Sequence, residues 1–161
     1  MNQVSTSSCT LVVYEASAGG RAALMHAADL ARAQRVPLVV LASAPQARVD
    51  SGCLRCRGSA GLWNLAMVEV AEAELQEARE LLAVAEPDDV RYIVGRGDLV
   101  RAITAAAADV GADCVIVPSE RPSRVRLPRR RSLASRLSTN RPFTVACPPT
   151  APGSAPPLAL P

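Results

Sequence analysis

The chain has 161 residues, a length that favours one domain. Hydrophobic residues make up 49% of it but aromatic residues only 2%, so its core must consist of aliphatic side chains and alanine. The net charge is +3, and charges interrupt every apolar run well before the roughly 18 residues of a transmembrane helix, which excludes a membrane-spanning chain.

Taken in chain order, the sequence alternates short β-branched runs with segments of helical periodicity. Ser17 is the expected cap of the first helix, and Asp98 and Gly111 bound a later one. A loop that contains two cysteines precedes the second helix. The predicted strands are 9–14, 37–43, 90–94, 113–117 and 142–147; the predicted helices are 20–35, 62–85, about 99–110 and 132–139; the predicted loop is 44–60.

These elements form one α/β domain over residues 9–147, between a disordered N-terminus (1–8) and a disordered proline-rich tail (148–161). Strands that alternate with helices pair in parallel through right-handed crossovers, which predicts a single open doubly wound five-stranded sheet. Ligands of such sheets bind beyond the carboxyl ends of the strands. The loops that follow the first, second and fourth strands are therefore the candidates for a site.

The charge is distributed unevenly, since residues 121–141 hold eight arginines and no acid. Such a patch favours an anionic partner, although a solvated loop without a ligand is the plain alternative. The N-terminus lacks the charged start and apolar stretch of a signal peptide, so we expect a cytoplasmic protein whose five cysteines are reduced.

Three segments stand out in the order and spacing in which they occur: LVVYEASAGGRAALMHAADLARA, GRGDLVRAITAAAADVGADCVIVPS and SLASRLSTNRPFTVAC. Together they resemble the universal stress protein (UspA-like) family. The resemblance spans about residues 10–147. It implies a flavodoxin-like strand order, 3-2-1-4-5, of the adenine nucleotide alpha hydrolase-like kind, and homodimers that pair through the fifth strand.

Family members that bind ATP carry G-x-x-G-x9-G-[ST] after the fourth strand and an Asp at the end of the first. Here the three glycines are replaced by Pro118, Arg121 and Arg131, and the Asp by Glu15. Proline has no N–H and fixes φ, so the loop is degenerate and ordinary ATP binding is not expected. The alternative is that arginine guanidinium groups, in place of backbone N–H groups, bind a phosphate. The candidate ligand or nucleotide site comprises Glu15, Ser17, Ser119, Arg121, Arg131 and Ser132.

Cys53 and Cys56 form a CxxC pair in the predicted loop. Such a pair supplies half of a zinc site, with Cys147 as a candidate third ligand, or a redox-active dithiol beside arginines. Incidental loop cysteines are the third interpretation. Trp63 is expected to anchor the second helix on the sheet; the alternative is that it covers the site or a partner surface.

No catalytic motif is present, and the single histidine, His26, offers no general-base network, so we expect no enzyme. The sequence favours a non-catalytic stress-response sensor or adaptor without a required cofactor, acting as a homodimer or with a protein partner. The alternatives are a nucleotide-binding member (ATP or another nucleotide), a thiol or metal switch at Cys53 and Cys56, and a nucleic-acid-binding module. The last is disfavoured because residues 121–141 include no aromatic residue for stacking on bases.

Overall fold

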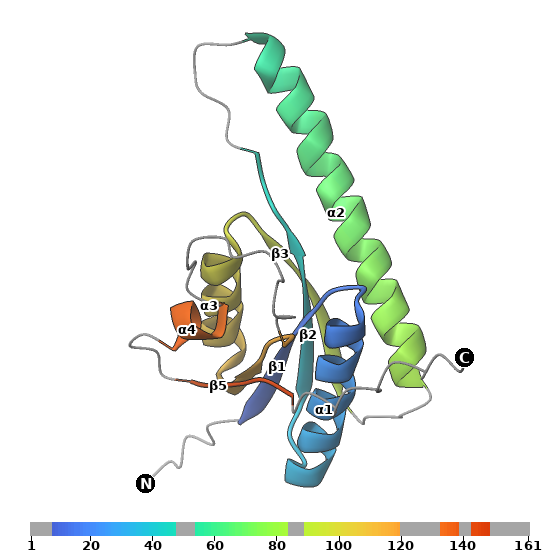
Figure 1. Cartoon of the computed structure of the whole chain (residues 1–161), viewed down its shortest axis with the longest axis vertical. Coiled ribbons are helices and arrows are strands. Elements are labelled where there is room, and N and C mark those ends of the chain that lie inside the picture. The colour runs from blue at the N-terminus through green and yellow to red at the C-terminus, as the bar shows by residue number, and fades with distance from the viewer. Residues whose placement is uncertain (1–7, 48–53, 84–88, 120–132, 139–142, 149–161) are drawn as a thin grey trace, which may run out of the picture.

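The computed structural model contains a five-stranded parallel sheet with helices on both faces (Figure 1). It describes residues 8–47, 54–83, 89–119, 133–138 and 143–148, and only the backbone of 54–57. The elements in order are β1 (Cys9–Tyr14), α1 (Ala18–Gln34), β2 (Leu38–Ala44), α2 (Leu54–Ala83), β3 (Val90–Arg96), α3 (Leu99–Val110), β4 (Ala112–Ile116), α4 (Leu133–Leu137) and β5 (Thr144–Ala146).

The strand order is β3-β2-β1-β4-β5, and every neighbouring pair is parallel. The predicted doubly wound fold and its strand order are therefore confirmed. The order reverses between β1 and β4, which places the switch point where these two strands end. Parallel pairing requires helical crossovers, and the sequence supplies one between each pair of consecutive strands.

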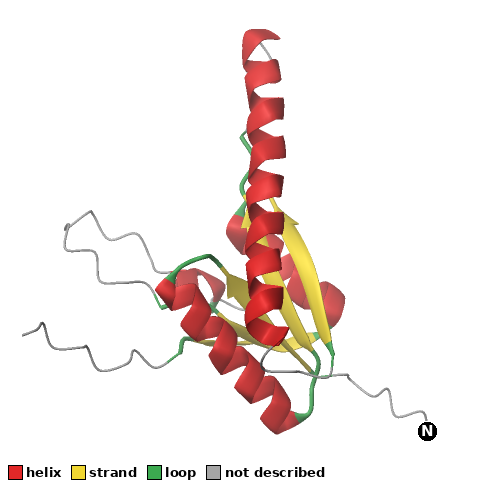
Figure 2. Cartoon of the chain, turned by 90° about the vertical axis from the view of Figure 1, so that its right-hand side faces the viewer, coloured by secondary structure: helices red, strands yellow, loops and turns green. Residues whose placement is uncertain are grey.

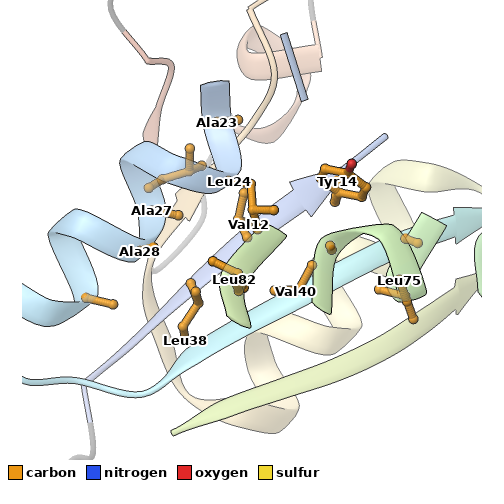
Figure 3. Close-up of a cluster of buried hydrophobic side chains, with 14 of the residues drawn as sticks. Val12, Tyr14, Ala23, Leu24, Ala27, Ala28, Leu38, Val40, Leu75 and Leu82 are labelled. Atoms are coloured by element: carbon orange, nitrogen blue, oxygen red, sulfur yellow. The ribbon is translucent and has the colours of Figure 1, made fainter. Parts of the chain in front are cut away.

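The sheet is covered on both faces because each central strand buries alternate residues on opposite sides. In β1, Val12 and Tyr14 pack beneath α1 and α2, whereas Leu11 and Val13 pack beneath α3 and α4. Figure 3 shows the first of these layers, in which Leu24 of α1 lies beside Val12. The core is aliphatic and alanine-rich, as the composition requires.

Local capping sets the helix ends. Ser17 is the N-cap of α1 and Asp98 that of α3, and each side chain accepts a hydrogen bond from a backbone N–H three residues later. Gly111 ends α3 in the left-handed region with φ 66°. These three predictions are confirmed, and the observed α1 begins two residues earlier than its predicted start.

Helix α2 differs from the prediction. It begins at Leu54, not at residue 62, so most of the second half of the predicted loop is helical. Gly58 lies in the predicted loop and Gly61 directly after it; in the helix both face open space, with nothing within 4 Å of where a Cβ atom would be. Trp63 does not anchor the helix, because it remains 51% exposed. The inner face is made by Ala71, Leu75, Ala78 and Leu82, with Val68 partly buried against the same cluster.

Among the described residues, no helix is both long enough and apolar enough to cross a bilayer. The predicted disorder of the N-terminus and of the proline-rich tail concerns segments that, apart from Ser8 and Pro148, lie outside the described residues.

Candidate functional site

The carboxyl end of β1 leads directly into the start of α1 through a hydrogen-bonded turn. The Ser17 hydroxyl donates to Glu15 Oε1 at 2.8 Å and accepts from the Gly20 N–H at 3.0 Å. The Ser17 N–H donates to the Glu15 carbonyl oxygen at 2.7 Å. Two predicted site residues, Glu15 and Ser17, are thus brought together, and the serine joins the acid to the helix start.

Two glycines allow this turn to pack closely. A Cβ at Gly20 would collide with the carbonyl oxygen of Glu15, and one at Gly19 would lie 3.2 Å from the carbonyl oxygen of Ser119. Gly19 therefore brings the start of α1 against the segment that follows β4. Ser119, the third described site residue, lies at the same edge of the sheet as Glu15 and Ser17.

Helix α2 contributes two carboxylates that the sequence analysis did not include in the site. Glu74 accepts a hydrogen bond from the Ala16 N–H at 3.2 Å. Burial raises the pKa of Glu74, the Ala16 hydrogen bond opposes that shift, and the negative charges of Glu15 and Glu77 add to it. Glu74 is therefore close enough to Glu15 and to Glu77 to be repelled by both.

Arg21 supplies the positive charge among the described groups here. Its guanidinium pairs with Glu77 Oε1, with Nη2 at 2.7 Å and Nε at 2.9 Å. This hydrogen bond lowers the pKa of Glu77. Burial, followed by the nearby Glu77, raises the pKa of Tyr14, whose buried hydroxyl lacks a hydrogen-bond partner within the described part of the chain.

The described part of this edge is thus unfavourable for an anion. Three carboxylates face one arginine, and that arginine is already paired with Glu77. The N–H groups of Ala16 and Gly20 are engaged by side chains of the protein itself. Pro118, which follows β4, has no N–H to offer, and the Val117 N–H donates to the Ala146 carbonyl oxygen at 3.0 Å.

The remaining predicted site residues Arg121, Arg131 and Ser132 lie outside the described residues. The predicted sheet topology and the family resemblance indicated that Glu15, Ser17 and Ser119 share one edge. They did not indicate Glu74 and Glu77, which lie more than fifty residues after Glu15 and Ser17 in the chain. Their signal was their place in α2, three residues apart and next to the buried Leu75 and Ala78, where a glutamate needs a partner.

The predicted thiol or metal residues are also described only in part. Cys53 lies outside the described residues, and of Cys56 only the backbone, in the first turn of α2, is described. Cys147 follows β5 and is exposed, whereas Cys9 is buried and Cys114 half-buried, with burial raising the pKa of both thiols. No group of three metal-ligating side chains occurs in the described segments. The thiol or metal switch stays a prediction.

Replacing Ser17 with alanine is expected to lower the free energy of unfolding by about 1 kcal/mol, because the Gly20 N–H loses its cap. Ser17→Gly is the matched control, with an expected loss of a few tenths of a kcal/mol. Urea denaturation followed by circular dichroism measures both. Equal losses in the two variants would show that the hydroxyl does not stabilise the start of α1.

Known protein structures share this architecture. The chain is similar to UspA from Lactobacillus plantarum, with a TM-score of 0.71 and 16% identity over 87% of this chain and 96% of that one. A universal stress protein from Archaeoglobus fulgidus in complex with dAMP gives a TM-score of 0.60 and 17% identity, over 87% of this chain and 95% of that one. A universal stress protein in complex with cAMP gives 0.59 and 19%, over 86% and 94%. No curated protein sequence matches the chain.

At such identities these structures establish the fold alone. The sequence profile of the universal stress protein family, however, matches residues 10–140, which is most of the chain. Together with the strand order and the β1–α1 turn, this match confirms the resemblance seen in the sequence. The chain belongs to the universal stress protein family.

Proposed function

We propose that this protein is a non-catalytic stress-response sensor or adaptor domain that does not bind ATP in the ordinary way. The observation that carries the proposal is the hydrogen bonding at the carboxyl end of β1. The Ala16 N–H is engaged by Glu74 and the Gly20 N–H by Ser17, and Pro118 stands where the family's loop has its first glycine. A phosphate cradle needs free backbone N–H groups, so triphosphate binding would have to overcome both their loss and the local negative charge.

The second candidate is a nucleotide-binding member with rebuilt phosphate contacts. Two structurally similar universal stress proteins are complexes with cAMP and dAMP. Glu15 occupies the end of β1, where the family's nucleotide-contacting acid is expected, and Arg121 and Arg131 would supply guanidinium contacts to the phosphate. A monophosphate would suit this arrangement better than a triphosphate because it brings less charge towards Glu15, Glu74 and Glu77.

We also propose a homodimer that pairs through β5, the strand at one end of the sheet order. A protein partner of the adaptor would then bind a dimer. Nucleic-acid binding through residues 121–141 is less favoured. Most of that segment lies outside the described residues, and its Arg136 lies 3.9 Å from the Asp98 carboxylate, in a contact within the protein.

Isothermal titration calorimetry of the purified protein with Mg²⁺ and ATP, AMP or cAMP separates the two candidates. We expect no saturable heat with ATP, and no release of inorganic phosphate after prolonged incubation. Saturable ATP binding would contradict the proposal. Binding of AMP or cAMP that is lost in Arg121→Ala/Arg131→Ala, but kept in the exposed control Arg101→Ala, would establish the second candidate instead.

A further inference from the structure

Helix α2 is much longer than the sheet that it covers. Its 30 residues extend about 45 Å, whereas the seven residues of β2 or β3 extend about 23 Å. Figure 2 shows the first half of α2 projecting beyond the sheet, without another described helix beside it. Most of the buried residues of α2 lie in its second half, namely Ala71, Leu75, Ala78 and Leu82, and Ala60 is buried in the first half.

The projecting half is apolar, yet Ala60 is the one buried residue among those of this half whose side chains the structure describes. Four of the five exposed large hydrophobic side chains in the described structure lie in this helix: Leu62 (72% exposed), Trp63 (51%), Leu65 (58%) and Val70 (50%). Residues 58–68 contain no charged side chain over three turns. A helix segment that is apolar around most of its circumference is normally buried, so this one is expected to have a partner.

The exposed side of α2 has a regular geometry between residues 59 and 73. Ser59, Ala66 and Ala73 are spaced by seven residues and all are exposed, with Trp63 and Val70 interleaved on the same side. Apolar positions that repeat every three and four residues form the seam of a two-helix pair. Small residues at Ser59, Ala66 and Ala73 leave room for the backbone of a partner helix to approach.

Charge along α2 indicates which partner fits. Residues 54–68 carry two arginines and no acid, whereas residues 69–83 carry five glutamates and one arginine. A second α2 in antiparallel orientation brings the positive half of each helix against the negative half of the other. A parallel pair would instead place like charges together. The surface is therefore complementary to itself in one orientation only.

We propose that the exposed face of α2 binds the α2 helix of a second copy of this chain, antiparallel and centred near Ala66. Trp63 and Val70 of each copy then lie in the shared seam, and the glutamate-rich second half of one helix runs alongside the first half of the other, which carries no acid. This interface is separate from pairing through β5. If both operate, each is a two-fold contact, and together they produce tetramers or longer assemblies.

Analytical ultracentrifugation of the full chain tests the interface. Leu62→Glu/Trp63→Glu is expected to weaken self-association by at least about tenfold, since a central tryptophan contact usually contributes that much. Met25→Glu, at the exposed large hydrophobic residue of α1, is the matched control and should leave association unchanged. Circular dichroism confirms that each variant is folded. A monomeric wild-type chain, or equal association of wild type and the double variant, overturns the proposal.

Disulfide trapping tests the orientation. Ser59→Cys and Ala73→Cys proteins are prepared separately, mixed and oxidised, and cross-linked peptides are identified by mass spectrometry, with the unmixed proteins as the background of native cysteines. Antiparallel pairing predicts a link between residue 59 of one copy and residue 73 of the other. In the control mixture, Ser59→Cys is replaced by Ala108→Cys, which lies at an exposed position of α3. Links of residue 59 to itself, or none above the control, overturn the proposal.

Discussion

Replacing Gly20 with alanine is expected to destabilise the domain by about 3 kcal/mol, the upper end of the cost of overpacking a rigid site. The new Cβ would collide with the Glu15 carbonyl oxygen and lie 3.0 Å from the carbonyl carbon. These atoms belong to the backbone, so the clash cannot be relieved by rotating a side chain. To remove the clash, the β1–α1 turn has to open, which also breaks the hydrogen bond from the Gly20 N–H to the Ser17 hydroxyl.

Gly61→Ala is the matched control because it makes the same substitution in a helix with nothing within 4 Å of the new Cβ. It should stabilise α2 by up to about 1 kcal/mol through helix propensity. Urea denaturation at low protein concentration, followed by circular dichroism, gives both values. If Gly20→Ala were as stable as the wild type, the close contact between α1 and Glu15 described above would be wrong.

Leu24→Ala is expected to lower the free energy of unfolding by about 3 kcal/mol, because it leaves a cavity in addition to the lost burial. Leu24 is fully buried between α1 and the sheet, beside Val12 (Figure 3). The surrounding residues include Ala27 and Ala28, whose small side chains cannot rearrange to fill the space. Eight of the sixteen buried residues in this cluster are alanines, so each larger side chain contributes a large share of the packing.

Met25→Ala tests this interpretation at the adjacent position of the same helix. Met25 is 41% exposed, and its truncation should change stability by less than about 0.5 kcal/mol. Thermal unfolding by calorimetry and urea denaturation should rank the two variants in the same order. A similar loss for both would mean that α1 does not bury Leu24 against the sheet in solution.

The fold was predictable because its signals are local. The strand β1 matches its predicted limits, Ser17 and Asp98 cap their helices, and Gly111 ends α3. Each of these features depends on a few neighbouring residues with strong conformational preferences. The start of α2 was not predictable in this way, because Gly58 and Gly61 resemble loop residues and their helical state involves only a small local difference in free energy.

By itself, the sequence determined the α/β class, the strand order through the family resemblance, and the absence of the glycines that an ordinary ATP loop requires. Only the tertiary structure showed that Glu74 joins Glu15 at the end of β1, that Gly20 must lack a side chain, and that Trp63 faces solvent. Caps and strand patterns act between near neighbours in the chain. The positions of Glu74 and Trp63 instead depend on how α2, which is distant from β1 in sequence, packs across the sheet. The requirement at Gly20 depends on how closely the backbone of α1 approaches the end of β1.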